Sequence, residues 1–394
     1  MIKIRHLLFL LVMTSSWSAP SWANDAEKEE TARQQAFQSG AQRIVDDFNA
    51  GSSDVFVDSI DRADLLDRVF GLRLIDQRVK KDIRKGLPQS FLRTITSSLP
   101  GADEGVKATL LGVESRGDRG RAVVRFDYPK FQFNYHEYEL RLRANQKVII
   151  YDWTDFLDGN LFTEAVGRSM VMAAPGKAAA RKLLDFQNVS ENELFQFAEL
   201  LKAARDRKLD RYLEIRDGMQ ERFQRQRIVV ETNVHLARQA KQRRQLVAGL
   251  AIMAKYYPEE PRYSLMLLDY YIPARRLDEA VAALQRLSER LDFPDAAMEA
   301  RLSAVALGKG DPQDASARAD VALALDDDLE LAWWSALKAR VALQDFARAT
   351  EALQQLEAQF GWDLGAKALQ QDKSYRGLLA SSEYQAWRES RQAE

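Results

Sequence analysis

The sequence contains no cysteine and only three histidines, His6, His136 and His235, among its 394 residues. The absence of cysteine excludes disulfides, thiolate metal sites, iron–sulfur clusters, a cysteine nucleophile and a lipid anchor attached to cysteine. With so few histidines, most metalloenzyme sites lack ligands. We therefore expect no metal or other cofactor, and a fold that is stabilised by packing alone.

Motifs for phosphate, nucleotide or zinc chemistry are also missing. The chain has no G-x-x-x-x-G-K-[ST], G-x-G-x-x-G, G-x-S-x-G or H-E-x-x-H sequence. Its 57 basic and 58 acidic residues give a formal net charge of −1, which does not favour general binding to nucleic acid. We therefore predict a protein that is not an enzyme and does not bind nucleic acid.

The N-terminus has the features of a secretory signal peptide. A short basic head precedes the apolar run 7–13, and small residues at Ser21 and Ala23 offer a cleavage site before Asn24. The apolar run is much shorter than the roughly 20 residues that span a bilayer as a helix. We expect residues 1–23 to be removed, no transmembrane segment after that removal, and a periplasmic protein, with secretion as the second choice.

Residues 24–175 predict an α+β domain in which helices come first and an antiparallel sheet follows. Apolar residues recur at helical spacing over 34–48 and again over 75–95. Between residues 110 and 153 the period changes to two, and bulky aromatic and aliphatic residues alternate with polar ones. This alternation is typical of a sheet with one buried face, and we expect three or four strands.

From residue 176 onwards the alternation disappears, and helical spacing continues to the C-terminus. Ser190 and Glu193 have the spacing of a capping box, which predicts that a helix begins there. We divide this all-helical half into degenerate repeats over 176–258, regular repeats over 259–362 and capping helices over 363–394.

The regular repeats have a period of 34–35 residues. Equivalent helices are predicted to begin at Leu277, Pro312 and Phe346. Each carries a small residue three positions later, at Ala280, Ala315 and Ala349. This pattern resembles the tetratricopeptide repeat, a 34-residue helix–turn–helix unit. The resemblance implies a helical solenoid that binds a protein or peptide partner.

Two features suggest where such a partner binds. Tyrosines gather around Pro258 and Pro261, where they can serve an interface or pack between repeats. Residues 202–244 contain 13 basic and 6 acidic residues, whereas residues 292–330 contain 3 basic and 10 acidic residues, so the solenoid is electrically polarised. The candidate partner-binding residues are Tyr263, Tyr270, Tyr271, Arg238, Arg243 and Arg244.

The sheet region has a second resemblance. Its last predicted strand, 147–153, ends in Asp-Trp and is followed by Asp158-Gly159 and a helix. In this the domain resembles the cone-shaped α+β family of nuclear transport factor two, which implies a pocket for an apolar ligand. The candidate pocket residues are Tyr128, Tyr135, His136, Asp152 and Trp153.

Three functions are consistent with these patterns. The leading hypothesis is an exported, non-catalytic scaffold or adaptor that binds a protein or peptide in the cell envelope. The alternative is a periplasmic carrier of an apolar ligand or lipid in the cone, which the repeats dock to a partner. A third is a hydrolase-type site around His136 and Asp152. We expect, however, that His136 faces solvent from a strand and that Asp152, Asp155 and Asp158 are strand-end caps and turn formers.

Overall fold

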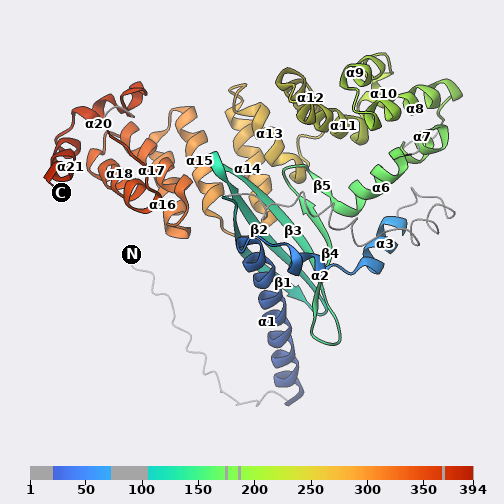
Figure 1. Ribbon diagram of the computed structural model, residues 1–394, viewed down its shortest axis with the longest axis horizontal. Helices are drawn as coiled ribbons and strands as arrows, with labels where there is room; N and C mark the ends of the chain where they lie inside the picture. The colour runs from blue at the N-terminus through green and yellow to red at the C-terminus, as the bar shows by residue number, and fades with distance from the viewer. Residues whose placement is uncertain (1–20, 72–104, 174–175, 185–187, 366–368, 394) are drawn as a thin grey trace, which may run out of the picture.

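The computed structural model describes residues 21–71, 105–173, 176–184, 188–365 and 369–393 (Figure 1). Most of the predicted signal peptide and the helix predicted over 75–95 lie outside these ranges. An α+β region is followed by a long stack of helices, which confirms the predicted fold class.

Among the described residues, the α+β region contains three helices and a five-stranded sheet. The helices are α1 (Ser21–Asn49), α2 (Asp54–Ser59) and α3 (Arg62–Gly71). The strands are β1 (Lys107–Arg116), β2 (Arg119–Tyr128), β3 (Gln132–Leu142), β4 (Val148–Asp155) and β5 (Asn160–Leu161). They form an antiparallel meander in the order β1-β2-β3-β4-β5, one short strand more than predicted.

The helical half begins directly after β5. Its first helices are α6 (Phe162–Ala173), α7 (Lys177–Leu183), α8 (Glu191–Arg205), α9 (Leu209–Asp217), α10 (Glu221–Gln224), α11 (Arg227–Gln239) and α12 (Arg243–Tyr256). They are followed by α13 (Ser264–Tyr271), α14 (Leu277–Leu291), α15 (Ala296–Lys309), α16 (Pro312–Leu325), α17 (Glu330–Ala342) and α18 (Phe346–Phe360). The predicted capping box is present at the start of α8, where Ser190 and Glu193 each accept a hydrogen bond from the other's backbone N–H.

Five helical hairpins repeat with one period: α8–α9, α11–α12, α13–α14, α15–α16 and α17–α18. Each turn contains one residue with positive φ, at Arg207, Lys241, Arg275, Gly310 and Gln344, so that successive turns are 34 or 35 residues apart. In each turn the next residue donates its N–H to a carbonyl five positions earlier, as from Lys208 to Ala203. The regular repeat therefore extends upstream as far as α8.

Both faces of the sheet are buried (Figure 1). On one face Phe48 of α1 packs edge-on against Phe126, with ring centroids 5.4 Å apart. On the other face Val123 and Phe133 share a core with α11–α15. Residues 122–126 of β2 are consequently all buried. The prediction of one buried face is wrong, because the second face carries polar groups whose partners come from the distant solenoid.

The C-terminal end of the stack is closed by short helices. They are the 3-10 turn η3 (Lys373–Tyr375), α20 (Arg376–Ala380) and α21 (Ser382–Ala393). Tyr375, Tyr384 and Trp387 are buried in one cluster with Leu353 and Leu356 of α18. These aromatic residues cover the last apolar face of the solenoid, as the sequence predicted.

Candidate functional site

The sheet meets the solenoid around a buried arginine, Arg125 of β2, whose side chain is 1% exposed. Its Nη1 donates to Asp295 Oδ1 at 2.5 Å, its Nη2 to Asp326 Oδ2 at 2.7 Å and its Nε to Asp127 Oδ2 at 3.0 Å. Burial opposes the charge, but Asp295 and Asp127 raise the pKa of Arg125 above its ordinary value. This cluster fixes β2 against the turns that precede α15 and α17.

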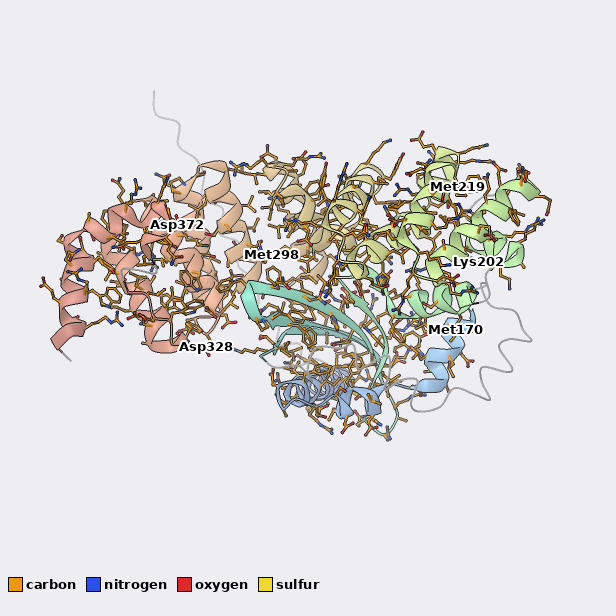
Figure 2. All side chains as sticks on the ribbon, turned by 45° about the horizontal axis from the view of Figure 1, so that its top comes forward. Met170, Lys202, Met219, Met298, Asp328 and Asp372 are labelled. Carbon is orange, nitrogen blue, oxygen red and sulfur yellow. The ribbon has the colours of Figure 1, made fainter. Side chains whose placement is uncertain are left out.

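Asp295 connects the sheet to the first turn of α15. As the N-cap, its Oδ2 accepts the N–H of Met298 at 2.9 Å, and the same oxygen accepts the hydroxyl of Tyr135 at 2.5 Å. Figure 2 labels Met298 at this junction. Burial and the charge of Asp295 raise the pKa of Tyr135, so the hydroxyl remains a donor. One carboxylate thus caps a helix, neutralises Arg125 and holds β3.

A second contact joins the sheet to the end of α14. Arg121 of β2 donates to the carbonyl oxygens of Arg290 at 3.0 Å and Leu291 at 2.6 Å, where a helix C-terminus favours a cation. Beside it, Phe293 packs against Gly112 at the irregularity in β1. A Cβ on Gly112 would lie 2.2 Å from Phe293 Cε1, so this close approach requires glycine.

A cavity of about 570 Å³ lies between the sheet and helices α12, α13 and α15, and we call it the junction pocket. Its apolar wall consists of Phe133, Leu157, Leu246, Val247, Leu250, Leu265, Leu268, Ile272 and Pro273. Its remaining lining residues are Tyr128, Gln132, Arg238, Arg243, Asp269 and Arg301. The volume is within the range of small-molecule sites.

The junction pocket has an excess of positive charge, with three guanidinium groups around one carboxylate. Burial raises the pKa of Asp269, and attraction by Arg238, Arg301 and Arg243 opposes that shift. No carboxylate of the described residues lies within ion-pair distance of Arg243 or Arg301. Arg238 does have such a partner, since its Nη1 donates to Asp158 Oδ1 at 2.9 Å.

Sequence reasoning identified part of this site. Of the predicted partner-binding residues, Arg238 and Arg243 line the junction pocket, whereas Arg244 does not, although Arg243 and Arg244 are both exposed. Asp269 and Arg301 were missed. A signal existed for Asp269, because it belongs to a lining stripe on α13 with spacing i, i+3, i+4 and i+7. Arg301 had none, because only the tertiary structure brings it to the sheet.

The predicted tyrosines serve packing. Tyr263 is fully buried, and its hydroxyl donates to Glu231 while its ring lies against Gly159. Tyr271 is also buried, and Tyr270 is half-buried beside Arg276. Tyr263 and Tyr271 are therefore not available to a partner in this structure, because they fill the space between the sheet and successive hairpins.

The five predicted pocket residues do not share one cavity. Tyr135 and His136 are successive residues of β3, so their side chains point to opposite faces of the sheet. Tyr128 lines the junction pocket, whereas Trp153 lines a second cavity of about 440 Å³ beside α6 and α11. The interior of the predicted cone, between the sheet and the N-terminal helices, contains the buried rings of Phe37, Phe48, Phe56 and Phe126.

His136 and Asp152 do not pair with each other. His136 is 1% exposed, so the expectation that it faces solvent is wrong; its Nε2 lies 3.5 Å from Asp155 Oδ2. Asp152 lies next to the start of α6, where it accepts hydrogen bonds from Thr163 Oγ1 at 2.5 Å and Thr163 N at 3.2 Å. The pair that the hydrolase alternative requires is not formed in this structure.

Asp155 is the last residue of β4 and Asp158 lies in the turn between β4 and β5, which fits the prediction of strand-end and turn residues. Asp155 Oδ1 accepts the N–H groups of Leu157 at 2.8 Å and Asp158 at 3.2 Å. Burial would raise the pKa of Asp155, but the neighbouring His136 and hydrogen bonds from Asn134 and the backbone of Asp158 hold it at about 2. The ionised Asp155 therefore stabilises a turn that contributes to both cavities: Leu157 lines the junction pocket, and Asp158 lines the second cavity.

A third surface feature lies on the C-terminal arm. Val321 and Leu325 of α16 are 48% and 44% exposed, and Trp362 after α18 is 42% exposed. Gln359 of α18 donates to Asp328 Oδ1 at 2.7 Å, which places the end of α18 beside the loop that follows Leu325. Figure 2 labels Asp328 on this arm. We define the C-terminal patch as Val321, Leu325, Asp327, Asp328 and Trp362.

Comparisons with known proteins leave the family open, since neither a family model nor a curated protein matches this sequence. Within the described ranges, no three His, Asp or Glu side chains are grouped to hold a metal ion. The same ranges include no helix with the length and apolar character needed to cross a membrane.

Proposed function

We propose that this protein is an exported, non-catalytic adaptor that binds a protein partner in the cell envelope through a tetratricopeptide-like solenoid. The hairpins support this proposal, because they repeat every 34–35 residues as helix–turn–helix units, as that repeat does. The small residues expected where the two helices of each unit pack closely, Ala280, Ala315 and Ala349, are buried. Such solenoids present extended surfaces to proteins and peptides.

The C-terminal patch is the observation that carries the proposal. Exposed large apolar groups that lie together on a folded protein mark interaction sites, and tryptophan is enriched among the residues that dominate binding energy. Two exposed carboxylates, Asp327 and Asp328, adjoin the apolar side chains. The patch therefore suits a partner segment that combines apolar side chains with lysine or arginine.

The position of the sheet favours this arm over the middle of the solenoid. The sheet shares its core mainly with α11–α15, and the same core reaches Ala322 of α16 and Ala332 of α17. In Figure 1 the helices from α18 to α21 lie beyond the sheet, whereas α17 still contacts it, since the rings of Phe131 and Trp334 are 6.2 Å apart. Leu325, Asp327 and Asp328 are exposed on either side of Asp326, so a partner can reach them while Asp326 keeps its ion pair with Arg125.

Site-specific photocrosslinking tests the proposed function. A photoreactive residue at Val321 in the full chain should yield an adduct in which the crosslinked partner peptide contains basic and apolar residues. The same residue at the exposed Phe195 of α8 is the control and should not yield it. Asp327→Lys with Asp328→Lys should abolish the adduct, whereas Glu289→Lys on α14 should not. Identical adducts at Val321 and Phe195 would refute the proposal.

Export is tested separately. We expect the chain to appear in the periplasmic fraction of a Gram-negative host with Asn24 as its first residue, because cleavage after Ala23 follows the small-residue rule for signal peptidase. Mass spectrometry of the purified protein measures that terminus. Recovery of the chain in the cytoplasm with residues 1–23 intact would contradict this part of the proposal.

A further inference from the structure

We infer that the junction pocket binds a small anionic amphiphile, with one carboxylate or phosphate headgroup and a single apolar chain. The headgroup lies between Arg243 and Arg301, and the chain lies against Leu246, Leu250 and Leu268. The site is distinct from the C-terminal patch, so this inference does not depend on the proposed function.

The cations that line the junction pocket favour an anion. Burial lowers the pKa of Arg301, and its hydrogen bond among the described residues is to a carbonyl oxygen, that of Phe131 at 3.1 Å. Arg243 lines the pocket but is solvent-exposed, and it forms no hydrogen bond or ion pair with any described residue. An entering carboxylate or phosphate would form charge-assisted hydrogen bonds with the half-buried guanidinium of Arg301, and the charge of Arg243 adds to the attraction.

Arg238 contributes both to the wall and to the charge. Its Nη1 donates to the carbonyl oxygen of Leu157 at 3.0 Å and to Asp158 Oδ1 at 2.9 Å, which holds the β4–β5 turn at the rim of the pocket. Its Nη2 is buried and has no hydrogen-bond acceptor among the described residues. This N–H group is therefore available to the headgroup of a ligand.

The arrangement along α12 matches an amphiphile. Arg243 is the first residue of α12, and Leu246, Val247 and Leu250 follow on the same face at i+3, i+4 and i+7. The headgroup thus lies at a helix N-terminus, which favours anions, and the apolar wall begins one turn further on.

The lining favours a lipid-like molecule over a peptide. Nine of the fifteen lining residues are apolar, and Asp269 is the single carboxylate among them that could accept backbone N–H groups of a peptide. A cavity of about 570 Å³ is of the size that holds one drug-sized ligand, and this suits a single chain better than a two-chain phospholipid.

Calorimetric titration of the full chain tests the inference with four ten-carbon probes. Decanoate and decyl phosphate should bind, decanol should bind at least tenfold more weakly, and decyltrimethylammonium should not bind. The preference between the two anions identifies the headgroup. Arg243→Glu should weaken decanoate at least tenfold, whereas Arg244→Glu should leave the affinity unchanged, because both residues are exposed but Arg244 does not line the pocket.

Several results would overturn the inference. They are failure of decanoate to bind, equal affinity for decanoate and decanol, and equal effects of the two charge reversals. Binding of a peptide with a free carboxylate in place of decanoate would also overturn it. Circular dichroism of both variants shows that they fold, and crosslinking at Val321 in Arg243→Glu separates a failure here from a failure of the proposed function.

Discussion

Single carboxylates decide how the two halves of this chain fit together, and Asp295 is the clearest case. We predict that Asp295→Asn lowers the free energy of unfolding by about 3–5 kcal/mol, because the buried Arg125 loses the charge of one of its partners. The amide can still cap α15, so the loss reports the ion pair. Urea unfolding at neutral pH measures the difference.

Asp311→Asn is the matched control for Asp295→Asn. Asp311 also caps a helix, accepting the N–H of Asp314 at 3.0 Å, but it is exposed and has no buried cation beside it. We expect it to change stability by less than about 0.5 kcal/mol, because asparagine and aspartate are similar N-caps. Equal losses for the two variants would show that capping, and not the buried ion pair, explains the effect.

Asp155 predicts a specific dependence of stability on pH. Its folded-state pKa of about 2 lies below its ordinary value of 3.8, so the ionised form is stabilised by folding. This contribution, about 2 kcal/mol, is complete above pH 4 and is lost as the pH falls through 2. Asp155→Asn should therefore be less stable at pH 6 and should lose less stability between pH 5 and pH 2.

Urea unfolding of both proteins across this pH range provides the measurement. The curves of stability against pH should converge at the acidic end, because protonation removes the same charge from the wild-type protein. Parallel curves would contradict the assignment of the pKa shift to Asp155.

Among the elements, the hairpin turns offer a direct test of the repeat. Lys241 holds positive φ in the same position as Gly310, and side chains other than glycine are strained there. We predict that Lys241→Gly stabilises the protein by up to about 1 kcal/mol and that Gly310→Ala destabilises it by about 1 kcal/mol. Thermal unfolding measures both, and shifts of the same sign would contradict an equivalent turn.

Most elements could be predicted because their signals are local. The spacing of apolar residues defined α14, α16 and α18, and the capping pair at Ser190 defined the start of α8. The repeats upstream of residue 259 were harder to recognise. Their common feature is a backbone conformation, and of the five turns only that at Gly310 carries the glycine that marks it in a sequence.

At the scale of the whole molecule, a substitution at Gly112 tests how the sheet packs against the solenoid. We predict that Gly112→Ala destabilises the protein by about 1–3 kcal/mol, because the added methyl group overlaps the ring of Phe293. Phe293→Leu in the same chain should recover most of this loss. Gly176→Ala, where a Cβ meets nothing within 4 Å, is the control.

Hydrogen exchange measures which segments lose stability in Gly112→Ala. Peptides from β1 and from α14–α15 should lose protection together in Gly112→Ala, while peptides from α21 should be unchanged, because a solenoid transmits contacts only between neighbours. Loss of protection in β1 alone would mean that the sheet and the helices do not unfold as one unit.

The sequence by itself determined the types of the elements, their order and the period of the repeats, because periodicity and turn chemistry act over a few residues. Only the tertiary structure decided that the solenoid covers the sheet. Arg125 and Asp295 are 170 positions apart, and neither signals its partner. The same holds for the junction pocket, where Arg301 and Gln132 become neighbours of one cavity. Contacts between distant segments depend on how whole surfaces pack, and local sequence patterns carry no record of that packing.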